Sequence, residues 1–537
     1  MKKRFVSLAL SSLMLVGAAC GCSGGKGKNA DYDTDALKKA SYPVKTDVEL
    51  TMFMNQGGSA AQQKAEDGAK LFVDLLYEKT GIKVKRIVPP LGQEEQQFNI
   101  MIASGEMTDI ITWSWGNFLG GADKAVTDGY IISLNDLMSD YTPNFKKLLE
   151  SDPELDKMVK SDNGNYCYFP GMNQKGDGDV LMLTSGYMFR KDWLDELGLP
   201  VPETVDDWYN TLKAFKEQKG AAAPFSMSAS DSSYGLLGLA GAYGITLDFY
   251  KDDNGKIQFG YVQPQCKDFL AMMNKWYSEG LIDKNISNVD GKTLDSCLLN
   301  GKTGAVFGWL GGGMGKWLTA AKSLGMESFD LVGVPAPVLN RGDRVKYASK
   351  EMPVAVTGQA ISSQTKHKEL AAKFLDYGYS EEGHMLYNFG EEGVTYNMVD
   401  GQPVYTDFIL NNKNGKTIDD QLSYYTHALG KGPFVMDTRY IKFRYNKDQQ
   451  KQAQINWGDN DVDKYQIPYL TPSAEESKEF ATIMNNINTY TSEMYMQFVV
   501  GKKPLSEFDS FVSQIKDYGI DRAIEIKQAA LDRYNAR

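Results

Sequence analysis

Residues 48–88 read VELTMFMNQGGSAAQQKAEDGAKLFVDLLYEKTGIKVKRIV and decide the fold. Apolar and polar residues alternate over 48–54, which is the period of a strand buried mainly on one face. Over 65–76 apolar residues recur every three or four positions, as they do on one face of a helix, and Gly81 stops the run. Residues 82–88 predict a second strand. This order predicts a βαβ unit, and therefore an α/β fold with a parallel sheet covered on both faces.

A second helix is expected over residues 94–104, followed by a short apolar strand, TDIITW, at residues 108–113. Two tryptophans, Trp113 and Trp115, lie at the carboxyl end of this strand. Ligands of open α/β sheets bind beyond the carboxyl ends of the strands, so both indoles are candidate binding residues. Either could instead be a core side chain.

The chain opens with the three parts of a secretion signal, in the stretch MKKRFVSLALSSLMLVGAACGC. Basic residues come first, an apolar run over residues 5–16 follows, and small residues precede Cys20. This run is too short to cross a bilayer as a helix, which takes about 20 residues. We therefore expect residues 1–19 to be removed as a signal peptide.

A cysteine directly after small residues resembles the lipobox of bacterial lipoproteins, in which that cysteine carries a diacylglyceryl group. Both Cys20 and Cys22 fit the pattern, and Cys20 is the expected site of lipid attachment. Two acyl chains anchor a protein stably, so residues 20–45 are expected to form a lipid-anchored flexible tether on the extracellular face of the cell membrane. An ordinary cleavable signal with incidental cysteines is the alternative.

Composition narrows the class of protein. The 537 residues are 42% hydrophobic and are expected to form two lobes with a core each. The formal net charge of −11 makes nucleic acid a poor partner. Cys167, Cys266 and Cys297 are too widely spaced to be a disulfide framework. The three histidines lack the spacing of a transition-metal site, so no cofactor is expected.

Two later stretches bear on the lobes and the site. Residues 161–179 contain a hairpin-like segment and a polar, glycine-containing segment, which predict a crossover between lobes. Residues 300–317, NGKTGAVFGWLGGGMGKW, predict a strand that runs into a glycine-rich loop. The loop lacks the G-K-[ST] ending of a phosphate-binding P-loop. Its glycines are expected to let the backbone approach whatever Trp309 contacts.

Several segments together resemble the extracellular solute-binding proteins of ABC importers, in particular the family 1 carbohydrate-binding lipoproteins related to LplA, alginate-binding and maltose-binding proteins. The resemblance covers nearly the whole mature chain and is carried by residues 94–113, 188–204, 353–383, 391–406 and 505–534. Trp113 falls on a sugar-stacking tryptophan of maltose-binding protein. Asn55 and Gln56 follow the first strand, where that family turns cleft residues toward its ligand.

The resemblance implies a two-lobe clamp of the type II periplasmic-binding-protein class, with an α/β sheet in each lobe and several hinge crossovers. The first lobe is expected to comprise residues 46–172 with about 351–405. The second is expected to comprise about 180–350 with about 406–537.

A structural calcium ion is held by the alginate-binding members of this family. Here the only acidic alternation is Asp459, Asp461 and Asp463. It lacks the loop glycine and the closing glutamate of an EF-hand, so calcium remains an option with little support in the sequence.

A sugar has polar edges and weakly apolar C–H faces, so its site needs flat aromatic platforms and a ring of hydrogen-bonding groups. The candidate platforms are Trp113, Trp115, Trp309, Tyr396 and Trp457. The candidate edge partners are Asn55, Gln56, Glu351 and Glu391. Asn55 and Gln56 could equally form a turn, and Glu391 could form a solvated pair with Glu392.

We therefore expect a monomeric receptor without enzymatic activity that closes on an oligosaccharide and delivers it to an ABC permease in the membrane. A receptor for a peptide or another polar solute, or one coupled to a sensor, would keep the same fold. A secreted glycosidase or lyase is a further hypothesis, because tryptophan-lined grooves with carboxylates also serve hydrolysis. The sequence offers it no G-x-S-x-G motif, metal-ligand spacing or Cys/His pair.

Overall fold

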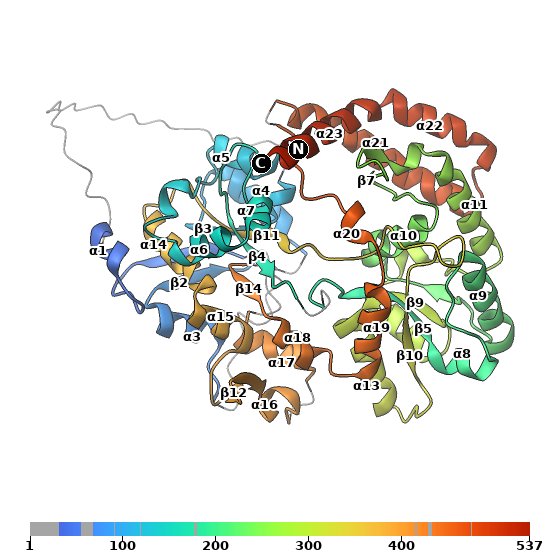
Figure 1. Cartoon of the computed structure of the whole chain (residues 1–537), viewed down its shortest axis with the longest axis horizontal. Coiled ribbons are helices and arrows are strands. Elements are labelled where there is room, and N and C mark those ends of the chain that lie inside the picture. The colour runs from blue at the N-terminus through green and yellow to red at the C-terminus, as the bar shows by residue number, and fades with distance from the viewer. Residues whose placement is uncertain are drawn as a thin grey trace, which may run out of the picture.

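The computed structural model describes residues 32–54, 68–90, 92–118, 120–176, 180–413, 416–427, 432–473 and 475–537. They form two lobes, each built on its own β-sheet and joined to the other by several crossings of the chain (Figure 1). The signal sequence with Cys20 and Cys22, and the candidate edge partners Asn55 and Gln56, lie outside the described residues. No helix in the described part of the chain is long and apolar enough to cross a membrane.

The first lobe contains a six-stranded sheet in the order β14-β4-β11-β3-β1-β2. Its strands are β1 (Glu49–Phe53), β2 (Lys83–Ile87), β3 (Ile110–Trp113), β4 (Phe169–Asn173), β11 (Val354–Ile361) and β14 (Phe434–Met436). β1 is parallel to β2 and β3, whereas β11 is antiparallel to β3 and β4, so the sheet is mixed. The predicted βαβ unit is confirmed, because α3 (Phe72–Thr80) lies between β1 and its parallel neighbour β2 in the chain.

α3 ends where the sequence predicted, at Gly81. This glycine has a φ of 72°, in the left-handed region that favours glycine at helix ends. A Cβ atom at this position would lie 2.1 Å from the carbonyl oxygen of Val44. A larger residue would therefore displace the segment that enters β1.

Helices cover both faces of the first sheet. Met52 and Phe53 are neighbours in β1 but enter different cores, because successive side chains of a strand point to opposite faces. The larger core lies under α1 (Thr34–Lys39), α3, α6 (Pro143–Ser151), α7 (Pro153–Val159), α14 (Lys368–Asp376) and α15 (Glu381–Phe389). The smaller one lies under α4 (Glu94–Ser104) and α5 (Gly121–Thr127).

The expectation of a flexible tether up to residue 45 is wrong for its last part. Residues 34–39 form α1, capped by the Asp33 side chain, and Leu37 is buried in the first-lobe core. The Tyr42 hydroxyl donates to the carbonyl of Lys373, and the Val44 N–H donates to the carbonyl of Thr80. Leu37, Tyr42 and Val44 pack against the first-lobe core, so this segment is part of the lobe.

The second lobe contains a four-stranded sheet in the order β10-β5-β9-β6. Its strands are β5 (Ser185–Arg190), β6 (Phe225–Ser226), β9 (Ala305–Trp309) and β10 (Leu331–Val334). β5 is antiparallel to β9 and β10, and β6 is parallel to β9. Its helices include α8 (Lys191–Leu197), α9 (Val205–Lys219), α10 (Ser232–Gly241), α11 (Pro264–Ser278), α12 (Gly291–Leu299), α13 (Lys316–Ser323), α21 (Ser477–Val499), α22 (Phe508–Asp517) and α23 (Ile520–Ala536).

The helix α9 shows how local sequence positions this lobe. The Thr204 side chain accepts a hydrogen bond from the Asp207 N–H, and the Asp207 carboxylate accepts one from the Thr204 N–H. This capping box satisfies two backbone donors at the start of the helix. Trp208, Leu212 and Phe215 then form the buried stripe, each fully withdrawn from solvent.

A third core is shared by the two lobes. It joins the hairpin of β12 (Tyr396–Val399) and β13 (Gln402–Tyr405) with α16 (Asp407–Leu410), α17 (Ile418–Tyr425), α18 (Thr438–Arg444), α13 and α19 (Asp448–Gly458). Residues 434–436 differ from the expectation that everything after residue 405 belongs to the second lobe. They form β14, which pairs in parallel with the open edge of β4 in the first sheet. α19 then packs on β10 of the second.

The end of α23 fastens the second lobe to the first. Arg533 and Arg537 both donate to the carboxylate of Asp162, which follows α7, over 2.8 Å and 3.0 Å from their Nε atoms. The Lys157 ammonium lies 4.9 Å from the centre of the Tyr534 ring. The lobes are therefore tied here as well as at the hinge crossings (Figure 1).

Candidate functional site

The largest cavity described between the lobes has a volume of about 1000 Å³. Asn117, just beyond the carboxyl end of β3, is its first-lobe wall residue. The second lobe supplies Ser232, Ser233 and Tyr234 of α10, together with residues of α21. The cavity thus lies beyond the strand ends, where the fold class places ligands.

Tyr234, which lines this cavity, forms an aromatic pair with Trp309, which is not among the lining residues. Trp309 is the last residue of β9, and its indole N–H donates to the Asp231 carboxylate over 3.1 Å. Tyr234 meets the indole edge-on and is 40% exposed, which leaves much of its phenol ring available to a ligand. Asp231 directly precedes α10, so one short segment carries both the ring and the carboxylate that orient Trp309.

Acidic groups surround this aromatic pair. Partial burial raises the pKa of Tyr234, and the negative charges of Glu351 and Asp231 add to the effect. Burial also raises the pKa of Tyr469 to about 12, again with a contribution from Glu351. Tyr469 is 41% exposed. The predicted edge partner Glu351 therefore lies near two exposed tyrosines that the sequence analysis did not select.

Trp113 lies on the first-lobe side, at the end of β3. Its indole stacks on the Phe98 ring of α4, with ring centroids 3.8 Å apart and planes 2° from parallel. The side chain is partly exposed. Because Phe98 covers one face of the indole, only the other face and the edge remain for a ligand.

Three predicted platforms are core side chains instead. Trp115 is fully buried, and its indole N–H donates to the carbonyl of Ile111 over 3.2 Å. Trp457 is 7% exposed and donates to the carbonyl of Val334. A Cβ atom on Gly186 would lie 2.4 Å from the Trp457 ring, so this indole lies flat against β5. Tyr396 is buried in the shared third core.

Glu391 also has a structural role. Its N–H donates to the Thr395 hydroxyl over 2.7 Å, and its carbonyl accepts from the same hydroxyl. These bonds form the turn after α15, and Glu391 is not among the described residues that line the interlobe cavity.

The glycine-rich loop after Trp309 serves packing. A Cβ atom on Gly313 would lie 3.1 Å from the Trp317 ring, and one on Gly311 would lie 2.8 Å from the Asp419 carboxylate. The absence of a side chain at these glycines leaves room for the Trp317 ring and for Asp419 of α17. The expectation that they also bring the backbone close to the contacts of Trp309 stays a prediction.

The three aspartates considered for calcium are engaged in ion pairs. Arg344 bonds to both Asp459 and Asp461, and the Lys350 ammonium lies 2.7 Å from the Asp463 carboxylate. Two cationic side chains thus pair with the three carboxylates, which do not form a group that could hold a metal ion. Within the described ranges, no group of three or more His, Cys, Asp or Glu side chains could hold a metal ion.

Sequence reasoning missed Tyr234, Asp231 and Tyr469. The stretch SASDSSYG, residues 228–235, is rich in the small polar residues that precede helices, and it follows a strand. That signal could have placed Tyr234 at a strand end. Tyr469 lies in a crossover segment without regular structure, where sequence periodicity carries no information.

A family model for bacterial extracellular solute-binding proteins matches residues 54–385. The chain belongs to this family. A curated relative of this solute-binding protein is the fructooligosaccharide ABC transporter substrate-binding protein FusA of Streptococcus pneumoniae, which is 26% identical over 99% of this chain and 98% of FusA. The lipoprotein LipO of Bacillus subtilis is 24% identical over 83% of this chain and 84% of LipO.

Solved structures share the fold of this solute-binding protein. The alginate-binding protein AlgQ2, determined without calcium ion, superposes with a TM-score of 0.75 at 23% identity, over 92% of this chain and 100% of AlgQ2. FusA in complex with kestose superposes with a TM-score of 0.73 at 22% identity, over 91% of this chain and 100% of FusA. The predicted two-lobe α/β fold and the predicted family are both confirmed.

Proposed function

We propose that this solute-binding protein captures an oligosaccharide in the interlobe cavity, without chemical change, and releases it to a membrane permease. The observation that carries the proposal is Tyr234, a 40% exposed ring that lines a cavity of about 1000 Å³ and is held edge-on against Trp309. That volume is at the upper end of the range for small-molecule sites, about 300 to 1,000 Å³, and favours a ligand larger than one sugar ring.

The chemistry of the wall supports a carbohydrate. Aromatic faces stack on the C–H faces of sugars, and the hydroxyls of Ser232 and Ser233 with the amide of Asn117 supply hydrogen bonds to their edges. Acidic groups near Tyr234 accept hydrogen bonds from sugar hydroxyls. The relatives point the same way, since FusA is named for fructooligosaccharides and has been solved with kestose.

Contacts from both lobes give the capture mechanism. Asn117 comes from the first lobe and Tyr234 from the second, so a ligand that touches both favours the arrangement in which the lobes lie close together. The ligand can shift this equilibrium only by its difference in affinity for the two states. We propose that the closed form is the one a permease recognises.

The proposed place of action is the extracellular face of the cell membrane. The lipobox-like cysteines support lipid attachment at Cys20 or Cys22, and a relative, LipO, is named a lipoprotein. The folded lobe already begins near residue 33, which leaves about a dozen residues after Cys20 as a tether. Labelling with a radioactive fatty acid, compared with a Cys20→Ser and a Cys22→Ser variant, tests this attachment.

A thermal-shift screen tests the choice of ligand. The mature protein is heated with fructo-, galacto-, manno- and glucuronate-containing oligosaccharides, and with a matched panel of di- to pentapeptides. A ligand that binds only the folded state, at a hundredfold its Kd, adds roughly 2.7 kcal/mol of stability and raises the melting temperature. We expect one glycan class to do so. A rise with peptides alone would contradict the proposal.

A further inference from the structure

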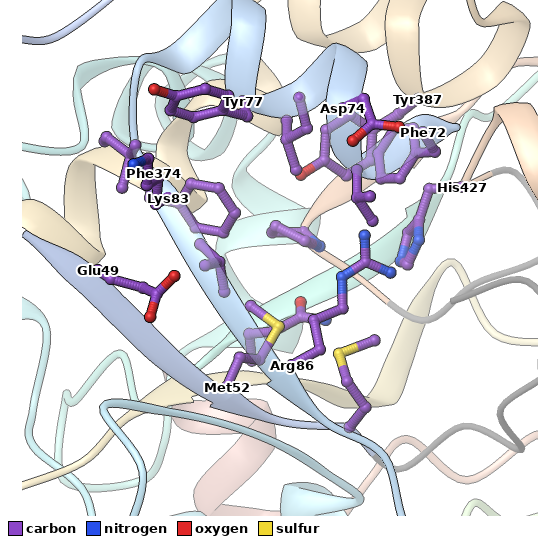
Figure 2. A pocket seen from close by; sticks show the side chains of 17 residues that line it. Glu49, Met52, Phe72, Asp74, Tyr77, Lys83, Arg86, Phe374, Tyr387 and His427 are labelled. Carbon is purple, nitrogen blue, oxygen red and sulfur yellow. The ribbon is translucent and has the colours of Figure 1, made fainter. Parts of the chain in front are cut away.

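A second cavity lies within the first lobe, apart from the interlobe cavity. It is a partly open pocket with a volume of about 240 Å³, and α3 and the two strands β1 and β2 form much of its wall (Figure 2). Much of its wall is apolar, including Phe72 and Leu76 of α3, Val84 of β2 and Phe374 of α14. We call it the α3 pocket. No residue that lines the interlobe cavity lines it.

Arg86 places a positive charge in this apolar setting. It lies on β2 opposite Met52 of β1, and its guanidinium points toward the rings of His427 and Phe72 (Figure 2). Among the described residues it forms no hydrogen bond or ion pair. The side chain is partly buried, and this burial lowers the pKa of Arg86 to about 10. An anion in contact with it would offset that cost.

Tyr387 adds a second donor beside Arg86. The side chain is buried and lines the pocket, and its hydroxyl forms no hydrogen bond with a residue in the described ranges. The Arg86 charge acts on this phenol and opposes the rise of its pKa that burial causes. Phe72 fixes the ring edge-on, with ring centroids 4.9 Å apart. A guanidinium fork and a phenol hydroxyl therefore face the same space.

Two features decide which anion fits. Asp74 and Glu49 also line the pocket, so a doubly charged phosphate would be repelled more strongly than a single carboxylate. The apolar wall needs an apolar partner, which a free inorganic ion does not supply. At roughly 30 Å³ for each water-sized group, the volume holds about eight non-hydrogen atoms.

We propose that the α3 pocket binds a small monocarboxylate with an aliphatic tail. The carboxylate accepts hydrogen bonds from the Arg86 guanidinium and the Tyr387 hydroxyl, and the tail lies along Leu76, Val84 and Phe374. This site is separate from the oligosaccharide site and does not depend on it.

Titration calorimetry with hexanoate, which matches the pocket in size, tests the proposal. Hexanamide serves as the neutral ligand of the same shape. We expect saturable binding of one hexanoate per chain, and binding of hexanamide at least tenfold weaker. Equal affinity for both, or no saturation by hexanoate, would overturn the proposal. Full displacement of hexanoate by an equal concentration of chloride would also overturn it, because the tail would then contribute nothing.

Variants separate the pocket from the fold. Arg86→Met keeps the length of the side chain but removes the charge, and we expect hexanoate to bind at least tenfold more weakly. Lys85→Met, on the exposed face of the same strand, is the matched control and should bind hexanoate as the parent protein does. Unchanged binding in Arg86→Met would refute the assignment.

A filling variant covers the case in which Arg86→Met fails to fold. Val84→Phe keeps Arg86 and occupies the apolar end of the pocket. We expect Val84→Phe to bind hexanoate at least tenfold more weakly than the parent protein, with an unchanged circular dichroism spectrum. Retention of hexanoate by a folded Val84→Phe protein would show that the tail lies elsewhere and would overturn the proposal.

Discussion

Tyr234 meets Trp309 edge-on, with ring centroids 5.7 Å apart and ring planes at 75°. The indole N–H of Trp309 is held by Asp231, which is three residues before Tyr234. A strand end, a helix start and one carboxylate thus fix Trp309 and, against it, the Tyr234 ring that lines the interlobe cavity. Rigid rings that need no ordering when a ligand arrives lose little entropy on binding.

Removal of the Trp309 ring should weaken the capture of oligosaccharide. We expect Trp309→Ala to lose about 1–2 kcal/mol of binding free energy, roughly tenfold in Kd, because the cavity-lining Tyr234 loses the ring that fixes it. Titration calorimetry with the glycan found by the thermal-shift screen measures this. Tyr209→Ala, which removes a partly exposed ring from α9 of the same lobe, should bind like the parent protein. Equal Kd values for both variants would remove Trp309 from the site.

Replacement of Trp115 should lower the stability of the fold, rather than the affinity for the oligosaccharide. It is fully buried, so Trp115→Ala leaves a cavity in the core under α4 and is expected to cost about 3–5 kcal/mol of unfolding free energy. Trp115→Phe should cost less, because most of the ring volume is kept. Urea unfolding followed by circular dichroism measures both. A Trp115→Ala protein that is as stable as its parent but binds no glycan would return Trp115 to the site.

The bonds from Arg533 and Arg537 to the Asp162 carboxylate, here called the Asp162 clasp, should restrict how far the lobes move apart. Asp162→Ala leaves Arg533 and Arg537 without their shared carboxylate, and the side chains of Asp162 and Arg537 are only 15% and 12% exposed. We expect a loss on the order of 1–3 kcal/mol of stability and a broader distribution of interlobe distances. Small-angle scattering and denaturant unfolding measure these effects.

A control for the clasp comes from an exposed ion pair. Lys146 and Glu150 pair on the surface of α6, with side chains 38% and 63% exposed. Glu150→Gln should change stability by less than about 1 kcal/mol and leave the interlobe distances unchanged. If both variants scatter alike, the clasp does not hold the lobes.

Asp376 should make stability fall as pH rises from about 4 to about 6. Burial raises its pKa from 3.8 to about 6 in the folded chain, although it accepts hydrogen bonds at the start of α6. The folded state then holds a proton that the unfolded state has lost, so the contribution is full below pH 3.8 and disappears above pH 6. Two pKa units correspond to about 3 kcal/mol.

The Asp376→Asn variant isolates this effect. Its unfolding free energy should lack the decrease that the parent protein shows between pH 4 and pH 6, since the amide does not titrate. Urea unfolding at intervals of half a pH unit gives both curves. Parallel curves across this interval would mean that the carboxyl of Asp376 titrates normally.

Local patterns predicted most of the first lobe and the helix α9. The alternation along β1, the stop at Gly81 and the Thr204–Asp207 capping box all act within a few residues, so sequence alone reveals them. The position of β14 could not be found in this way. Its three residues are held by the edge of β4, which lies more than 250 residues earlier in the chain.

The site was predicted less well than the fold, for a related reason. An indole after a strand has the same sequence signature whether it faces the core or the cavity. Trp115 donates to the Ile111 carbonyl and is buried, whereas Trp309 donates to Asp231 and stays partly exposed. Whether the indole is buried or partly exposed depends on its hydrogen-bond partners. The alternation of apolar and polar residues along the strand does not reveal these partners.

Native mass spectrometry tests the central claim most directly. The mature protein is mixed with oligosaccharides of two to six units from the class that raises its melting temperature, and the complex and the released ligand are both weighed. We expect one intact oligosaccharide per chain, released with its mass unchanged, and a smaller fraction of the complex in Trp309→Ala. Shorter sugars accumulating with time, or no complex at all, would contradict the account.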